Sequence, residues 1–132
     1  MSSRPKSFEA GTFARFCAVG GFGFAVDAGL LLVLNAGFGV DPIAARLVSV
    51  TTAVTATWII HRNFTFRSSD PGRFAEWRRF ATVNLAGAAI NFAVYWCVLA
   101  LAPATPPLVA LVAGSAVALA ANYLGSRVYA FR

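Results

Sequence analysis

Four long apolar stretches, separated by short polar segments, run along the chain. An α-helix rises about 1.5 Å per residue, so each stretch is long enough to cross the roughly 30 Å hydrocarbon core of a bilayer. The pattern therefore predicts an all-α integral membrane protein with four transmembrane helices. We place the spans at about 16–38, 43–60, 80–102 and 108–124.

The polar segments between the spans predict two helical hairpins. Gly39, Asp41 and Pro42 favour a tight turn between the first two spans, and the prolines within 103–107 favour another between the last two. The connection in the middle, 61–79, is the only sizeable loop. Its alternating arginines and aromatic residues are typical of a membrane–water interface.

The two halves of the chain carry similar patterns. Each half opens with an Arg-Phe pair, and each second span ends with arginines that alternate with aromatic residues. We interpret the halves as tandem repeats, about 13–67 and 77–132, within a single domain of 132 residues. With two spans per repeat, both repeats run in the same direction through the membrane. The matched positions are Arg15 with Arg79, Val19 with Val83, Gly23 with Gly87, Asp27 with Asn91, Arg62 with Arg127 and Phe64 with Tyr129.

Small residues recur at every fourth position of the second span in each half. Such stripes let helix backbones approach one another closely in lipid. On the first span, residues spaced three and four apart are expected to share one face of the helix. The expected stripes are Ala45, Ser49, Ala53 and Thr57, then Ala110, Gly114, Ala118 and Asn122, and the expected first-span face is Phe16, Gly20, Gly23 and Asp27.

The composition agrees with a membrane protein. Hydrophobic residues make up 58% and charged residues only 12%, against about a quarter charged in soluble domains. Of the 11 Lys and Arg residues, all but Arg46 lie in or beside the N-terminal lead, the 61–79 segment and the C-terminal tail. The positive-inside rule then places both termini in the cytosol, in a multi-pass protein of the cell inner (plasma) membrane. The net charge of +6 does not indicate nucleic-acid binding, because the basic residues flank the apolar spans.

Taken together, these features resemble the GtrA-like family of small four-span membrane proteins, over about 13–132. The resemblance rests on the opening of the first span, on an acidic residue later in that span, and on the end of the last span. The first half departs from the pattern by having Thr57 where the second half has Asn. The residues concerned are Arg15, Phe16, Val19, Gly20 and Asp27, then Trp58, Arg62, Phe64 and Phe66, and finally Asn122, Tyr123, Ser126, Arg127, Tyr129 and Phe131.

This resemblance implies a role in cell-envelope polysaccharide synthesis. Such proteins are thought to flip a polyprenyl-phosphate-linked sugar between leaflets, or to act as a non-transporting anchor for the membrane glycosyltransferase that makes it. A weaker alternative is a small proton-coupled exporter of cations that uses a first-span carboxylate, here Asp27. Four short helices form a small passage for a sugar, which favours a homodimer.

A polar path for translocation is expected along Asp27, Asn84, Asn91 and Asn122. Asp27 lies roughly 16 Å along the helix from Phe16, where a carboxyl group is costly and is expected to be neutral or paired. It serves either as a gate, a proton site or a partner for sugar hydroxyls, or as a link between helices through Asn91 or Asn122.

Arginines at the span ends are the candidate ligands of a lipid phosphate. Arg15, Arg62 and Arg127 lie at the inner interface, and guanidinium groups suit bidentate phosphate binding. The alternative is that they only orient the protein and attract anionic lipid. Arg46 either snorkels to outer headgroups or receives the phosphate on the far side.

The sequence shows no arrangement typical of an enzyme. It contains no nucleophile–base pair, no metal-ligand cluster and no Gly-rich phosphate loop. We therefore expect neither catalytic activity nor a bound metal or cofactor.

Overall fold

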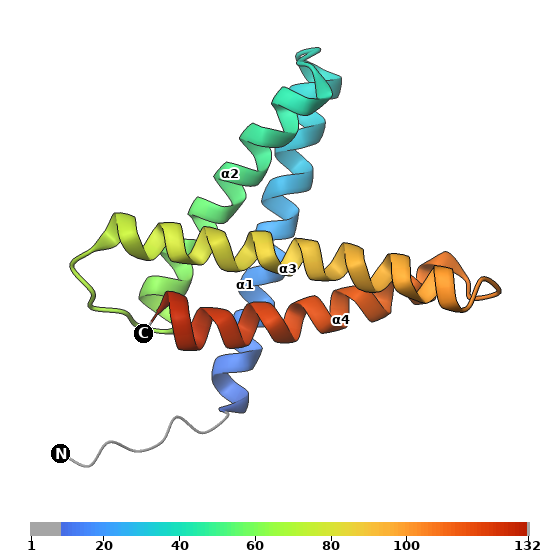
Figure 1. Cartoon of the computed structure of the whole chain (residues 1–132). Helices are drawn as coiled ribbons and strands as arrows, with labels where there is room; N and C mark the ends of the chain where they lie inside the picture. Colours follow the sequence, from blue (N-terminus) through green and yellow to red (C-terminus); the bar gives the residue numbers. More distant parts are fainter. Residues whose placement is uncertain (1–8, 132) are drawn as a thin grey trace. The chain divides into compact units, whose positions relative to one another are not determined.

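Four long helices make up the protein in a computed structural model that describes residues 9–131 (Figure 1). All four are long and apolar enough to cross a membrane, which confirms the predicted all-α class. No strand occurs within the described range. Helices α1, α2 and α4 each continue into a turn of π-helix. The elements are α1 (Ala10–Leu32), η1 (Val33–Gly37), α2 (Pro42–Ile60), η2 (His61–Thr65), α3 (Arg73–Leu101), α4 (Pro107–Gly125) and η3 (Ser126–Ala130).

The chain divides into two units, Met1–Ser69 and Asp70–Arg132. We call them the first hairpin, in which α1 packs along α2, and the second hairpin, in which α3 packs along α4 (Figure 1). In each hairpin, the turn end is where the two helices are joined, and the open end is the opposite one. The division falls between the two predicted repeats. Duplication of the halves and the cytosolic position of the termini stay predictions.

The helices extend beyond the predicted spans. Helix α1 begins at Ala10 and α3 at Arg73, because the segment ahead of each apolar run contains no proline that would stop the helix. At their other ends, α2 and α4 continue as π-helix through the arginine-containing segments. Only 66–72 of the expected 61–79 loop is therefore non-helical. A helix longer than the bilayer core tilts or projects into the interface.

The turn end of the first hairpin depends on two residues that the sequence singled out. Gly39 has a φ of 69°, a left-handed conformation that glycine adopts without a steric penalty. Asp41 then caps α2, because its Oδ2 accepts from the backbone N–H groups of Ile43 and Ala44, both at 3.1 Å. These two bonds satisfy donors that have no acceptor within the helix.

Removal of this cap has a predictable cost. We expect Asp41→Ala to lower the free energy of unfolding by about 1 kcal/mol, because two N–H groups at the start of α2 lose their acceptor. Asp41→Asn, which keeps an oxygen at the same place, should lose much less. Thermal unfolding of the purified protein, followed by circular dichroism, measures both. An Asp41→Ala protein as stable as the parent would contradict this role.

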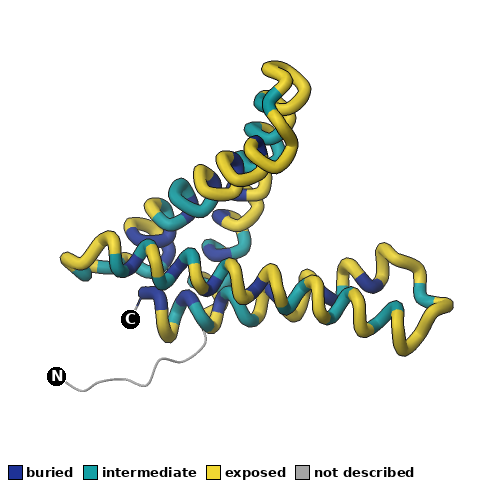
Figure 2. Tube along the Cα trace, turned by 45° about the horizontal axis from the view of Figure 1, so that its top comes forward, coloured by how far each residue is buried: buried dark blue, intermediate teal, exposed yellow. Residues whose placement is uncertain are grey.

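Small residues line the contact between the helices of each hairpin. Figure 2 shows buried positions recurring along each helix between exposed ones. The expected stripe of α2 is confirmed in full, and that of α4 is confirmed except at Asn122, which is only partly buried. The expected face of α1 was wrong at Gly20, which is exposed; Val19 is buried in its place. The buried residues are Phe16, Val19 and Gly23 in α1, Ala45, Ser49, Ala53 and Thr57 in α2, Glu76, Phe80, Val83 and Gly87 in α3, and Ala110, Gly114, Ala118 and Tyr123 in α4.

Candidate functional site

An ion pair joins the two helices of the first hairpin inside their apolar length. Nη1 of Arg46 in α2 lies 3.0 Å from Oδ1 and 2.9 Å from Oδ2 of Asp27 in α1. Ser49, one turn further along α2, donates from its hydroxyl to Oδ1 at 2.7 Å. The carboxylate of Asp27 in α1 therefore accepts hydrogen bonds from two residues of α2. Such charge-assisted bonds are the strong ones in proteins.

The position of the pair along the helix explains why both charges are held together. Asp27 lies roughly 25 Å from Ala10 and 15 Å from Gly37 along the helix, at 1.5 Å per residue. It is thus enclosed by apolar residues on both sides but nearer the turn end. Its side chain is 19% exposed, while that of Arg46 is 56% exposed. The acid is sheltered, and the guanidinium forms the accessible side of the pair.

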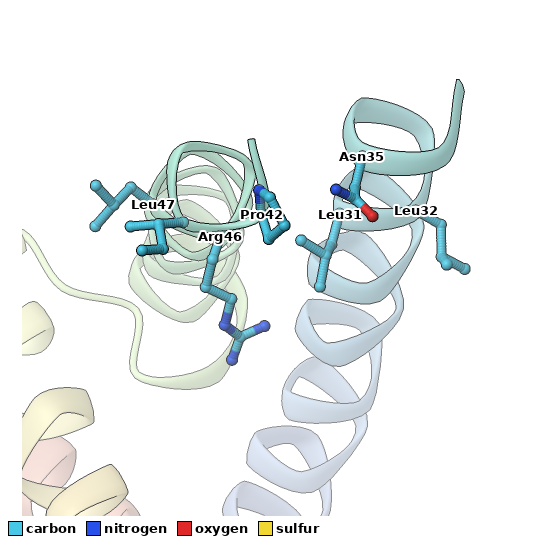
Figure 3. Close-up of a pocket in the computed structure, with 7 residues that line it drawn as sticks. Leu31, Leu32, Asn35, Pro42, Arg46 and Leu47 are labelled. Atoms are coloured by element: carbon cyan, nitrogen blue, oxygen red, sulfur yellow. The ribbon is translucent and has the colours of Figure 1, made fainter. Parts of the chain in front are cut away.

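A groove borders this guanidinium at the turn end. Its volume is about 490 Å³, and Figure 3 shows the Arg46 side chain reaching from α2 into the space beside α1. Apart from Arg46 and the amide of Asn35, the walls are apolar, so the groove combines a hydrocarbon-like surface with one cation. The lining residues are Leu31, Leu32, Asn35, Pro42, Ile43, Arg46 and Leu47.

The second hairpin has a similar groove without the charges. Its volume is about 590 Å³, and it is lined by Ala88, Asn91, Phe92, Tyr95, Pro107, Leu108 and Leu111. Asn91 stands at the position matched to Asp27, and Leu111 follows Pro107 at the distance at which Arg46 follows Pro42. The chemistry of the two hairpins therefore differs at the turn end.

The three asparagines of the expected path occupy different environments in the second hairpin. Asn84 donates to the carbonyl of Phe80 in its own helix at 2.9 Å. Asn91 packs where Gly114 on α4 leaves space, and Asn122 packs where Gly87 on α3 does. The two amides thus lie at different levels between the same two helices, and no hydrogen bond joins them among the described residues.

Buried polar atoms of Asn122 and Ser126 lie near the open end of the second hairpin. Within residues 9–131, neither Oδ1 of Asn122 nor Oγ of Ser126 has a hydrogen-bond partner. These residues are four apart and so share one face of the helix. An unsatisfied buried polar group costs about 1–3 kcal/mol, so a water molecule or a ligand hydroxyl would be favoured there.

At the open end of the first hairpin, aromatic rings enclose the start of η2. The ring of His61 stacks on Phe16 with centroids 4.8 Å apart, and Phe66 lies against both rings. His61 Nδ1 also lies 2.9 Å from the hydroxyl of Thr65. This packing fixes α1 to η2, and it leaves Arg62 only 8% exposed.

Arg15 lies at the same end but in a different setting. Its guanidinium carbon is 5.4 Å from the ring centroid of Phe64, within the range of a cation–π contact. Arg15 is partly buried, Arg62 is buried, and Arg127 is partly buried at the open end of the second hairpin. The structure therefore brings Arg15 and Arg62 to one end of one hairpin and places Arg46 at the other end.

Sequence reasoning did not anticipate the pairing of Asp27 with Arg46, nor the roles of Ser49 and Phe64. It offered Asn91 or Asn122 as the partner of Asp27, whereas the bonds go to Arg46 and Ser49. A signal was available, because Asp27 and Arg46 carry opposite charges on consecutive antiparallel spans. Both roles expected for Arg46 lie at the outer interface, and neither involves Asp27.

The chain is similar to known membrane proteins. The family model described as "GtrA/DPMS, transmembrane domain" matches residues 15–131. The chain is also 27% identical over 124 residues to the uncharacterized membrane protein YngA of Bacillus subtilis (strain 168). That alignment covers 91% of this chain and 79% of YngA. The family match begins at Arg15 and includes both hairpins.

Proposed function

The chain belongs to the GtrA/DPMS transmembrane-domain family, and from this premise we propose that it flips a polyprenyl-phosphate-linked sugar across the bilayer. The family acts in the handling of polyprenyl-phosphate sugars in membranes and is generally non-catalytic. The chain is a multi-pass membrane protein with four spans. We further propose the cell inner membrane as its location and a homodimer as its working form, since one copy provides only four helices.

One observation carries the proposal: a charged and hydroxyl-bearing cluster inside an apolar hairpin. Asp27, Arg46 and Ser49 provide donors and acceptors at a depth where lipid provides none. Polar groups at such depth are expensive and usually mark a substrate pathway. The prenyl chain of the substrate would stay in lipid, so only the sugar and phosphate need this cluster.

The second hairpin carries polar atoms of its own that would serve the sugar. Oδ1 of Asn122 and Oγ of Ser126, which lack partners among the described residues, would bond to sugar hydroxyls or to water. Asn84 and Asn91 add amides on α3. In the first hairpin the phosphate would be bound at the open end by Arg15 or Arg62 and at the turn end by Arg46, whose guanidinium is the exposed partner of the ion pair. Arg127 would bind it at the open end of the second hairpin.

Reconstitution in liposomes tests the proposal. The purified protein should move a labelled polyprenyl-phosphate sugar between leaflets, and Asp27→Asn should slow this movement at least about tenfold, because Arg46 and Ser49 lose a charged acceptor. Asp41→Asn is the matched control, since it changes an acid outside the path to the same amide. Equal transport by the Asp27→Asn variant and the parent protein would contradict the role of the cluster.

A second candidate function, an anchor for a membrane glycosyltransferase, is favoured by the start of α3. Phe74 is 71% exposed and stacks on Trp77 with centroids 6.1 Å apart, and Arg78 is exposed beside them. This role predicts co-purification with the enzyme that is lost in Trp77→Ala or Arg78→Ala variants, together with absence of transport in liposomes. Export of cations through Asp27 is less favoured, because Arg46 already occupies its carboxylate.

A further inference from the structure

We propose that Arg15, held against the ring of Phe64, binds the lipid phosphate at the open end of the first hairpin, and that the matched Arg79 has a structural role instead. The inference rests on the proposed function for the identity of the ligand. It goes further by assigning ligand binding to one of two matched arginines and stabilisation of the fold to the other. Arg15 and Arg79 each precede the buried phenylalanine that starts an apolar span, Phe16 and Phe80.

Arg79 has its donors engaged by the protein. Its Nη2 lies 3.1 Å from Oδ2 of Asp70 and 3.1 Å from the carbonyl oxygen of Ala130, and its Nε lies 3.3 Å from the same carbonyl. Ala130 ends η3, so Arg79 ties the last turn of the second hairpin to the start of α3. Phe80 supports this tie by packing against Phe131 with centroids 5.5 Å apart.

Arg15 has no such acceptor within the part of the chain that the structure describes. Among residues 9–131, no carboxylate or carbonyl oxygen accepts from its guanidinium, and its contact with the protein is the ring of Phe64. The nearby Glu9 accepts instead from the hydroxyl of Thr12 at 3.0 Å. A guanidinium carries five N–H donors in a fixed fork that matches two phosphate oxygens. Those of Arg15 are therefore available to an anion.

The ring of Phe64 distinguishes Arg15 from an arginine that contacts only its surroundings. The aromatic contact limits the positions that the guanidinium samples, so less side-chain entropy is lost when a ligand binds. Phe64 remains 49% exposed, and its ring provides apolar surface for the lipid chain next to the phosphate. A cation beside an exposed ring at a helix end suits an amphiphile with an anionic head.

Other arginines of the candidate set fit this role less well. Arg62 is 8% exposed, and both Arg62 and Arg127 take part in further interactions with the protein. Arg67, Arg73 and Arg78 are exposed, but none of them lies over an aromatic ring among the described contacts. Arg15 combines accessible donors with a fixed position.

Binding measurements on matched variants test the division of roles. Purified protein in detergent is titrated with farnesyl phosphate, with a short-chain phosphatidic acid and with farnesol, which lacks the phosphate. We expect Arg15→Ala to weaken binding of the phosphate-bearing lipid at least about tenfold, as loss of a charge-assisted bond does. Phe64→Leu should weaken it about two- to fivefold, the worth of a cation–π contact. Tighter binding of farnesyl phosphate would identify a prenyl phosphate as the ligand, and tighter binding of phosphatidic acid would identify a phospholipid.

Arg79 provides the matched control. Arg79→Ala should bind the same phosphate within about twofold, while its thermal unfolding midpoint falls below that of Arg15→Ala. If Arg79→Ala does not fold, Arg79→Lys serves instead, because an ammonium can reach one of the two acceptors. Equal weakening by the Arg15 and Arg79 variants, or a loss of farnesol binding as large as the loss of phosphate binding, would overturn the inference.

The assay also separates this inference from the proposed function. Binding requires no translocation, so an Arg15-dependent phosphate site stands even where liposomes show no transport. Conversely, transport that is normal in Arg15→Ala, together with unchanged phosphate affinity, refutes the site and leaves the transport function intact.

Discussion

Replacing Arg46 by leucine is expected to lower the free energy of unfolding by about 1–3 kcal/mol. The change leaves the carboxylate of Asp27 in an apolar hairpin with only the Ser49 hydroxyl to stabilise it. Breaking a fully buried pair costs roughly 3–5 kcal/mol. The expected value is smaller because the Ser49 hydroxyl still donates to the carboxylate of Asp27, and because the Arg46 side chain, 56% exposed, is not enclosed by protein.

Two further variants show whether the loss of stability comes from breaking the ion pair or from removing either side chain alone. Asp27→Leu should cost less than Arg46→Leu, because an unpaired arginine one turn from the helix start can extend to the headgroups. The double variant should be more stable than Arg46→Leu, since it leaves no unpaired charge. Unfolding midpoints in detergent, read by circular dichroism, measure all three. A double variant less stable than both single ones would contradict the coupling.

Gly114→Ala should destabilise the second hairpin by about 2 kcal/mol, because the added methyl group meets backbone and not only a side chain. A Cβ atom at this position would lie 2.6 Å from the carbonyl oxygen of Asn91. That oxygen cannot move unless α3 and α4 separate, and such overpacking costs about 1–3 kcal/mol. The higher helix propensity of alanine offsets at most about 1 kcal/mol of this cost, so the variant is less stable overall.

Other glycines of the chain provide a graded control series. At Gly87 the added methyl would meet only the end of the Asn122 side chain, so Gly87→Ala should cost less, and Asn122→Ala in the same protein should restore stability. At Gly20 nothing lies within 4 Å, and Gly20→Ala should be neutral or slightly stabilising. Thermal unfolding of the three single variants tests the order. Equal midpoints would show that the helices are not held at the observed separation.

Local patterns anticipated much of the fold. Apolar length identified the four spans, and the spacing of Ala45, Ser49, Ala53 and Thr57 identified the buried face of α2. Both features depend on neighbours along one helix, so periodicity reveals them. The π-helical ends were not foreseen, because arginines alternating with phenylalanines indicate an interface equally well with or without helix. The helices accordingly run past the expected boundaries at 60 and 124.

The sequence singled out Asp27 and Arg46 but not the bond between them. Both are charged residues inside the predicted spans 16–38 and 43–60. Their bond depends on how α1 and α2 are rotated about their axes, and hence on which side chains meet. The same holds for Arg15 and Arg79, which look equivalent along the chain and differ only in the acceptors around them.

Residue order alone was enough to establish a four-helix membrane protein with small-residue helix contacts and basic ends, because hydrophobic length, spacing and charge are properties of single segments. Three-dimensional packing decided which polar groups bond to each other: it paired Asp27 with Arg46, gave Arg79 two oxygen acceptors and set Arg15 against the ring of Phe64. The reason is geometric. A hydrogen bond requires two atoms within about 3 Å, and that distance is set by the packing of two helices against each other.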